Sequence, residues 1–299
     1  MDRLEGKVVL VTGSGRGFGR AMAIAYAREG AKVVAASRTR SELESMVEVI
    51  HSKGGEVLAV PTDLSKEDQI YLLKDKVLNT YGRLDVLVNN AAASLWKTVE
   101  DMTVKDWDFT IAVNLRAPFI LTKAFLDNMK KQGRGSIINV TSRSAEIGFV
   151  AEIGYCPSKY GLEGLTQCFA LELKPYNIAV NSLNVAAPPD ARLKPTGLTL
   201  AEAEARPKEI REQYADDESM VEHFKDAWTF LALQDGSGVS GQRLGTRQLA
   251  EYLRRYGWEA AVANWRKKLT QAVYVTYDWP KSVQYQTGPG GSEIKELKF

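Results

Sequence analysis

The stretch "YCPSK" places Tyr155 and Lys159 four residues apart, a spacing that can support proton transfer. In a helix, residues four apart lie one turn apart on the same face, so these two side chains would meet. A free tyrosine has a pKa of about 10, and a neighbouring ammonium lowers that pKa by roughly 1–3 units because it stabilises the phenolate. The pair therefore predicts a tyrosine that exchanges a proton with a substrate oxygen.

Two further residues support this interpretation. Proline is tolerated in the first turn of a helix, so Pro157 places Tyr155 and Lys159 at a helix start. Ser142 lies 13 residues before Tyr155, at the end of the strand-like run "GSIINVTS". The alternatives are that the pair lies on a solvated helix face, that Ser142 caps a helix or turn, and that Ser144 takes its place.

A glycine-rich loop follows the first apolar run. Four glycines occupy alternate positions there: Gly13, Gly15, Gly17 and Gly19. A strand ending at Thr12 and a helix opening near Phe18 would place the backbone amides of the loop at a helix N-terminus, which favours a bound anion. The glycines do not fit the G-x-G-x-x-G dinucleotide fingerprint. A flexible Gly/Ser loop is the alternative, but the strand-loop-helix context favours a phosphate-binding loop.

Apolar runs bounded by turn residues alternate with stretches of helical spacing, which predicts βαβ units and a parallel sheet. The runs are rich in Val, Ile and Leu, as expected of strands covered by helices on both faces. We therefore predict a doubly wound, Rossmann-like α/β fold. The expected strands are Lys7 to Val11, Lys32 to Ala36, Glu56 to Val60, Leu84 to Val88, Ser136 to Val140 and Ile178 to Leu183.

Helix-end signals support this alternation. Ser41 to Glu44 and Thr103 to Asp106 have the sequence of capping boxes, and Gly30 is placed as a C-terminal cap. The predicted domains are a nucleotide-binding and catalytic domain over residues 1–245, with a substrate loop at about 187–233, and a helical extension and tail over 246–299.

Composition excludes several classes of function. The 299 residues carry 39 Lys and Arg against 37 Asp and Glu, so the net charge of +2 predicts neither a nucleic-acid nor a membrane-surface partner. The two cysteines and two histidines form no metal-ligand pattern in the sequence, so we expect no metal site. No leader or long apolar span is evident, so we expect a cytoplasmic protein that binds a small molecule.

The spacing T-G-x-x-x-G-x-G, met by Thr12, Gly13, Gly17 and Gly19, resembles that of the short-chain dehydrogenase/reductase family. Further family motifs follow in order, so the resemblance extends from about Lys7 to Leu183. It implies interconversion of a ketone or aldehyde with an alcohol by hydride transfer. The implied catalytic residues are Tyr155 as acid/base, Lys159 to lower its pKa and hold the ribose, Ser142 to orient the substrate oxygen, and Asn114 to support a proton relay.

The resemblance also implies residues that bind the cofactor. Where members that use NAD have an acidic residue, this chain has Ser37 and Arg38, and Arg16 adds a second cation in the glycine loop. Guanidinium groups suit a 2′-phosphate, so NADP(H) is expected rather than NAD(H), although either arginine could be a solvated surface charge. The remaining cofactor contacts implied are Phe18, Asp63, Leu64, Asn90 and Ala91, with a helix N-cap as the alternative role of Asp63.

The chain departs from the family pattern in two places. First, Val185 and Ala186 replace the usual Pro-Gly, and Asp190 falls near the usual threonine, which puts the nicotinamide contacts in doubt. Second, the sequence that follows "DGSGVSGQRL" differs from the usual ending of the family. These departures motivate the alternative of a cofactor-binding regulatory or scaffold protein with little turnover. The resemblance implies a homo-oligomer, a dimer or tetramer, paired through the helices that hold Asn114 and Tyr155.

Overall fold

The computed structural model describes residues 2–189, 205, 207, 208 and 216–271, with side chains described up to residue 266. Within them, seven strands form one parallel sheet in the order β3-β2-β1-β4-β5-β6-β7. Each of the six predicted strands is present within two residues of its expected bounds, which confirms the doubly wound sheet. The strands are β1 Val8–Thr12, β2 Lys32–Ser37, β3 Glu56–Pro61, β4 Val86–Asn89, β5 Gly135–Thr141, β6 Ile178–Asn184 and β7 Arg243–Gly245.

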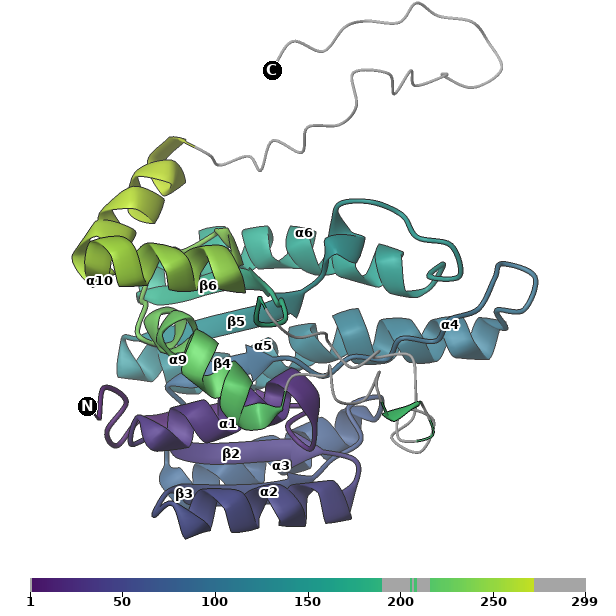
Figure 1. Ribbon diagram of the computed structural model, residues 1–299, viewed down its shortest axis with the longest axis horizontal. Coiled ribbons are helices and arrows are strands. Elements are labelled where there is room, and N and C mark those ends of the chain that lie inside the picture. Colours follow the sequence, from purple (N-terminus) through teal and green to yellow (C-terminus); the bar gives the residue numbers. More distant parts are fainter. Residues whose placement is uncertain (1, 190–204, 206, 209–215, 272–299) are drawn as a thin grey trace, which may run out of the picture.

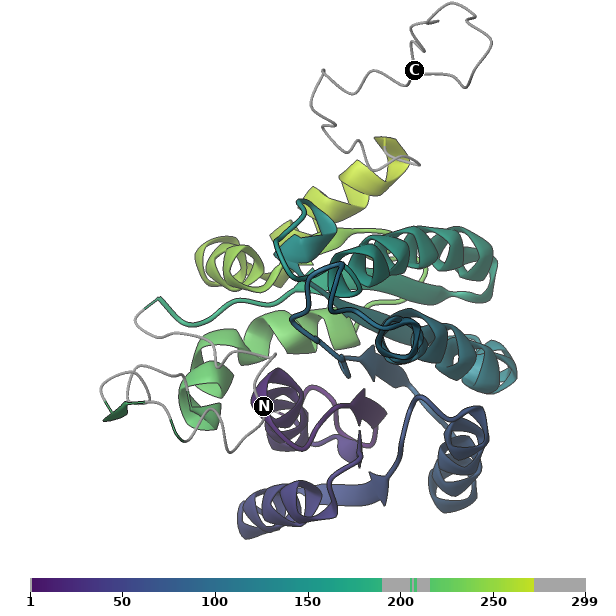
Figure 2. The same cartoon turned by 90° about the vertical axis from the view of Figure 1, so that its right-hand side faces the viewer.

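Helices cover both faces of this sheet (Figures 1 and 2). In Figure 2, α1, α2 and α9 lie on one side of the strands and α3, α5 and α6 on the other. Strands β1, β4 and β5 are buried along their whole length, as expected of parallel strands that helices cover on both faces. The bounds are α1 Gly17–Arg28, α2 Arg40–Ser52, α3 Glu67–Tyr81, α4 Val104–Ile111, α5 Ala117–Gln132, α6 Tyr155–Leu173, α9 Asp217–Ala232 and α10 Thr246–Gln271.

Helix α9 corrects part of the predicted substrate loop. Phe224 and Trp228 are fully buried, and the Tyr26 hydroxyl of α1 lies 3.5 Å from the Trp228 carbonyl oxygen. The second half of that segment is therefore a core helix, because its aromatic residues fill the face of the sheet next to α1. Residues 190–204, 206 and 209–215 of the predicted loop, and residues 272–299 of the predicted tail, lie outside the described residues.

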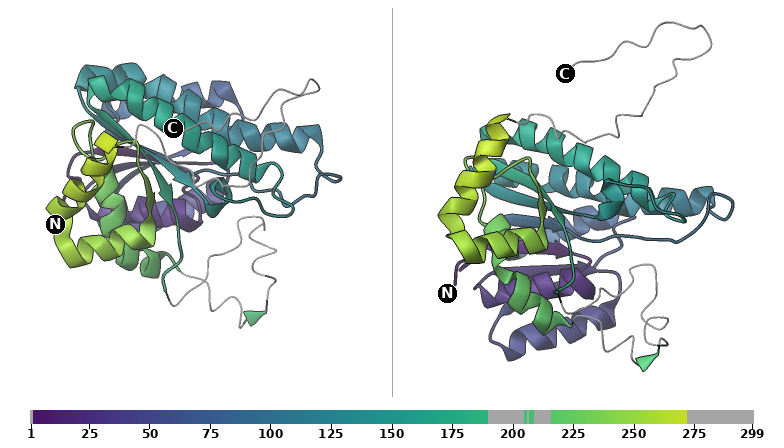
Figure 3. Two further views of the ribbon diagram at one scale, coloured as in Figure 1. Left: turned by 90° about the horizontal axis from the view of Figure 1, so that it is seen from above. Right: turned by 45° about the horizontal axis from the view of Figure 1, so that its top comes forward.

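Helix α10 forms the described part of the C-terminal extension and bends at Gly257, where φ is 80° (Figure 3). Leu249 and Leu253 are buried in the same core as α1 and α9. After the bend, the Trp258 ring meets Phe230 of α9 edge-on, with 5.5 Å between ring centroids. The extension up to the bend and just beyond it thus packs against its own chain.

The helix ends agree with two of the three predicted caps. Thr103 and Asp106 form the expected capping box at α4, and Gly30 has φ of 81° just after α1. The box expected at Ser41 is wrong: α2 already begins at Arg40, and its N-cap, Thr39, makes no side-chain capping bond. Ser41 lies within the first turn, where its hydroxyl cannot cap that helix.

One continuous helical run, Val104–Gln132, is long and apolar enough to cross a membrane by length and composition alone. Half of its most apolar window is buried inside the protein, however. It includes α4, a π-helical turn at Ala112–Arg116, and α5, which packs against the sheet. We interpret its apolar character as that of a core helix.

We expect the extension to contribute to stability. Leu253→Ala should lower the free energy of unfolding by about 2–4 kcal/mol, because it leaves a cavity between α10 and α9. Glu251→Ala, at an exposed site two residues earlier, is the matched control and should change it by less than about 0.5 kcal/mol. Urea unfolding measures both, and equal effects would contradict the packing of α10 described above.

Candidate active site

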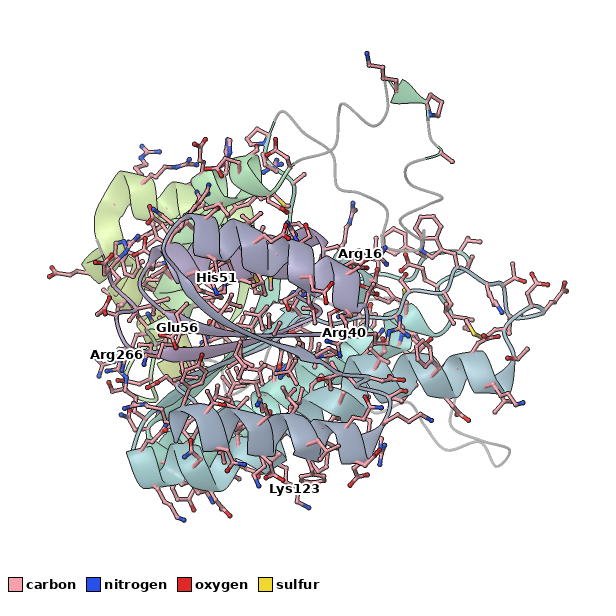
Figure 4. The ribbon with its side chains drawn as sticks, turned by 90° about the horizontal axis from the view of Figure 1, so that it is seen from below. Arg16, Arg40, His51, Glu56, Lys123 and Arg266 are labelled. Atoms are coloured by element: carbon pink, nitrogen blue, oxygen red, sulfur yellow. The ribbon has the colours of Figure 1, made fainter. Side chains whose placement is uncertain are left out.

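The predicted site residues gather at the carboxyl ends of the strands, where the strand order reverses between β1 and β4. In Figure 4, Arg16 and Arg40, which follow β1 and β2, lie to the right of Glu56, which begins β3. The Thr12 hydroxyl joins the two strands at the reversal. It donates to the Val88 carbonyl at 3.2 Å and accepts from the backbone amides of Asn90 and Ala91 at 3.0 and 3.1 Å.

Two loop glycines are required by contacts within the chain. A Cβ on Gly13 would lie 2.7 Å from the Ala91 Cα, and a Cβ on Gly19 would lie 2.3 Å from the Gly13 carbonyl oxygen. The side-chain amide of Asn90 also donates to the Thr12 carbonyl at 2.9 Å. Gly13 and Gly19 therefore allow the loop to pack on the turn after β4, a role that the sequence could not separate from making room for a pyrophosphate.

Gly17 meets a different requirement. Its φ is 59°, and a Cβ there would meet no atom within 4 Å, so the space beside it is open. Helix α1 has no side-chain cap at Arg16 and no acidic residue in its first turn. Its first amides can therefore receive an anion, which fits the phosphate of a dinucleotide. Phe18, by contrast, is half-buried and packs against the core.

Arg16, Ser37 and Arg38 lie around this loop. Both arginines are exposed, and neither forms an ion pair with any residue that the structure describes. The Arg38 guanidinium carbon lies 5.5 Å from the centre of the Phe109 ring of α4. Ser37 ends β2 and is half-buried. Two guanidinium groups without an ion-pair partner in the described part of the chain flank the loop. The residues present therefore suit a phosphate.

Glu42 is a charged neighbour that the sequence did not reveal. A Cβ on Gly15 would lie 2.6 Å from Glu42 Oε2 and 3.0 Å from Ser37 Oγ, so the first turn of α2 packs directly on the loop. The available signal was Gly15 itself, a glycine that the family spacing does not require. A carboxylate thus lies against the glycine loop that the two arginines flank.

Asp63 and Leu64 follow β3. The Asp63 carboxylate accepts from the Ser65 amide at 3.0 Å and from the Ser65 hydroxyl at 2.8 Å. It does not cap α3, whose N-cap is Lys66, so the alternative role of Asp63 as a helix N-cap is wrong. Leu64 is buried. Asp63 therefore stabilises the turn after β3, at the same edge of the sheet as the glycine loop.

Tyr155 begins α6 and Lys159 follows one turn later, as predicted. The Lys159 ammonium lies 5.5 Å from the centre of the Tyr155 ring and donates to the Val140 carbonyl of β5 at 2.8 Å. Lys159 is 1% exposed, which excludes the alternative of a solvated helix face. A buried ammonium beside a phenol is an arrangement suited to proton transfer.

Burial, however, has the largest influence on the pKa of Tyr155. It raises the pKa of Tyr155 to about 12, partly opposed by hydrogen bonding to Ser142 and reinforced by the negative charge of Glu152. Burial lowers the pKa of Lys159 to about 8, although the carboxylate of Glu163 acts to raise it. Desolvation therefore sets the direction of the pKa of Tyr155 in the protein alone, and the lowering of that pKa by Lys159 stays a prediction.

Ser142 directly follows β5. Its hydroxyl oxygen accepts from the Ser144 amide at 3.1 Å, so Ser142 caps the short 3-10 turn Arg143–Ala145 as well as approaching Tyr155. Ser144 instead donates its hydroxyl to Glu152 at 2.7 Å. The competition between the two serines is thus resolved by their contacts: hydrogen bonding to Ser142 acts on Tyr155, while Ser144 is tied to a carboxylate.

Asn114 is buried in the π-helical turn between α4 and α5. Its side chain accepts from the Ala93 amide at 2.7 Å and donates to the Ala93 carbonyl at 2.9 Å and to the Ser158 hydroxyl at 3.0 Å. Each polar group of this amide has a protein partner, so the side chain holds the segment after β4 against α6. π-helical turns are frequent at functional sites, because they redirect backbone groups of a helix.

We expect Lys159→Met to remove a pH dependence of stability. The pKa of Lys159 is about 8 in the folded protein and about 10.4 in an unfolded chain. Between these values the unfolded chain binds more protons, so this lysine makes the free energy of unfolding rise with pH. Its cost is greatest below pH 8, where it amounts to about 3 kcal/mol.

Urea unfolding at pH 7 and at pH 9.5 measures this difference. Lys159→Met should be more stable than the wild type at pH 7 by about 1–3 kcal/mol, since the lost bond to Val140 offsets part of the gain. The advantage should shrink at pH 9.5. Lys123→Met, at a solvent-facing lysine of α5, is the control (Figure 4). An advantage that does not change with pH would contradict the lowered pKa.

Comparisons with known proteins agree with this geometry. A family model described as short chain dehydrogenase matches residues 7–188. An uncharacterized oxidoreductase of Thermotoga maritima is 40% identical over 179 residues, which cover 60% of this chain and 70% of that protein. A 3-oxoacyl-[acyl-carrier-protein] reductase of the same organism is 34% identical over 248 residues, or 81% of this chain and 97% of that protein.

Solved structures give the same result. A metagenomic short-chain oxidoreductase in complex with NADP matches with a TM-score of 0.67 at 29% identity, covering 81% of this chain and 98% of that one. Levodione reductase matches with a TM-score of 0.68 at 27% identity, covering 83% and 98%. With the fold, the glycine loop and the Tyr155–Lys159 pair in place, the chain belongs to the short-chain dehydrogenase/reductase family of NAD(P)-dependent oxidoreductases.

Proposed function

We propose that this protein interconverts a ketone or aldehyde with an alcohol, using NADP(H). The observation that carries the proposal is the buried ammonium of Lys159 beside Tyr155. Burying a charged amine costs free energy, and such groups concentrate at functional sites. NADP(H), when bound, would supply or accept the hydride.

Tyr155 is the proposed acid/base. Because its pKa is raised to about 12, the phenol keeps its proton at neutral pH and is ready to donate it to a carbonyl oxygen. Ser142 would orient that oxygen, and Lys159 would hold the ribose and stabilise the phenolate that remains. Asn114 would support the proton relay by fixing Ser158 and the start of α6.

The preference for NADP(H) over NAD(H) rests on Arg16 and Arg38. Two exposed guanidinium groups without ion-pair partners among the described residues suit a 2′-phosphate. Thr12, Gly13, Gly17 and Gly19 shape the loop, and the first amides of α1 would receive the phosphates. The other proposed contacts are Phe18, Ser37, Asp63, Leu64, Asn90 and Ala91.

The remaining proposals concern the setting of the enzyme. We expect a cytoplasmic homo-oligomer, a dimer or tetramer, that acts on small molecules and has no nucleic-acid or membrane partner. The balanced charge, with 39 basic and 37 acidic side chains, supports the proposal that the protein has no nucleic-acid or membrane partner. On the helices proposed to pair, the exposed Phe119 of α5 and the half-buried Phe169 of α6 stack with 6.3 Å between ring centroids and support an oligomer through that face.

The function is tested by a screen of carbonyls and alcohols followed through NADPH absorbance and repeated with NADH. We expect turnover with NADPH, and a loss of about 10²–10⁴-fold in kcat for Tyr155→Phe with NADPH binding retained. Tyr71→Phe, at an exposed tyrosine of α3, is the control. Wild-type rates in Tyr155→Phe would overturn the mechanism, and NADPH binding without turnover across the panel would favour a regulatory protein.

Glu42 should oppose the two arginines. We expect Glu42→Gln to tighten NADPH binding relative to NADH by about 3- to 10-fold, because it removes a negative charge beside the site proposed for the 2′-phosphate. Glu44→Gln, at an exposed position two residues along α2, should leave the ratio unchanged. Fluorescence titration gives both dissociation constants, and an unchanged ratio in Glu42→Gln would place the phosphate elsewhere.

A further inference from the structure

Arg243, the first residue of β7, joins two segments that carry catalytic residues. Its guanidinium donates from Nη2 to the Ser142 carbonyl at 2.9 Å and contacts Glu146 Oε1 at 2.6 Å. Its Nε lies 3.3 Å from Glu163 Oε1 on α6. One side chain thus contacts both the turn after β5 and the helix that holds Tyr155.

Glu163 explains why a cation is needed there. It follows Lys159 by one turn of α6, and its side chain is 4% exposed. Its Oε2 accepts from the Ser182 hydroxyl at 2.6 Å. Among the residues that the structure describes, its Oε1 has no hydrogen-bond partner and forms an ion pair with the Arg243 guanidinium alone. A buried carboxylate without a balancing cation is strongly destabilising.

The Ser142 carbonyl explains why the cation is an arginine. This oxygen accepts from the Ala145 amide at 3.0 Å and from Arg243 at 2.9 Å, so both of its lone pairs are used. The five donors of a guanidinium are arranged as a fork and can satisfy a carbonyl and two carboxylates together, which a lysine ammonium cannot do in the same geometry.

We propose that Arg243 is a positioning residue of the active site: it fixes the main chain at Ser142 and balances the charge of Glu163, one turn from Lys159. The inference rests on the proposed function for its catalytic consequence. The contacts that carry it involve neither the cofactor nor the substrate. Arg243 lies just before the chain departs from the family ending, in a run for which the family spacing indicated no role.

The test separates positioning from stability with the variants Arg243→Met, Glu163→Gln and the double variant. Arg243→Met leaves the Glu163 carboxylate unpaired, so we expect Tm to fall by about 5–10 °C. The double variant removes the buried charge together with its partner, so Tm should return to within about 3 °C of the wild type. The double variant also keeps the test open if Arg243→Met fails to fold.

The kinetic readout then decides between the two roles. In the double variant kcat should remain at least about 10-fold below that of the wild type, with the KM for NADPH within about twofold, since the hold on the Ser142 carbonyl is still missing. Glu163→Gln alone removes the charge beside Lys159 but keeps Arg243, so kcat of the double variant should also lie at least about 10-fold below that of Glu163→Gln. A double variant that recovers both Tm and kcat would show that Arg243 is only structural and would overturn the proposal.

Hydrogen exchange of the peptide containing Ser142 to Glu146 gives a readout that does not need turnover. Exchange should be faster in the double variant than in the wild type, and equal exchange would overturn the proposal even if no substrate is found. Absence of turnover in the wild type would count against the proposed function alone. Arg134→Met is the matched control, because Arg134 donates to the Leu233 carbonyl at 3.0 Å and lies near Asp235. It should alter neither kcat nor this exchange.

Discussion

The burial of Lys159 is the constraint on which the site depends. An ammonium that is 1% exposed has lost its water, and the protein replaces that water with the Val140 carbonyl at 2.8 Å and the charge of Glu163. These partners come from β5 and from the next turn of α6, so the lysine can stay charged only while helix and strand remain in register. Burial of Lys159 costs folding free energy, and it lowers the pKa of this lysine to about 8, which is close to the pH at which enzymes work.

A second constraint acts at the glycine loop, where the chain packs on itself before it packs on any ligand. Thr12 links the ends of β1 and β4, and Gly13 and Gly19 let the backbone touch the turn at Asn90. The loop is therefore held in shape by the sheet, and only Gly17 opens to free space. This division explains how a loop of small residues can be rigid enough to present amides to an anion.

The sequence predicted those features that depend on local periodicity and spacing. All six expected strands, the opening of α1 near Phe18 and the Tyr155–Lys159 turn were found where their patterns placed them. It failed where a property depends on contacts distant in the sequence. The pKa of Tyr155 is raised by burial beneath other segments, and Glu42 reaches the glycine loop from α2 at a point that the sequence marks only by Gly15. The error at Ser41 has a local cause, because the helix begins two residues earlier than the capping pattern predicts.

The two departures from the family pattern, found separately in the sequence, contact each other in the structure. The Thr246 hydroxyl donates to the Asn184 carbonyl at 3.0 Å, and the Arg247 guanidinium donates to the Ala187 carbonyl at 2.7 Å. The residues that open α10 therefore hold the chain on both sides of Val185, where the usual Pro-Gly is missing. A Pro-Gly pair fixes a turn through its own backbone preferences, whereas here side chains from the extension supply the bonds. These two bonds make the changed ending and the changed loop after β6 one connected part of the carboxyl edge of the sheet, next to Arg243, which holds the Ser142 carbonyl.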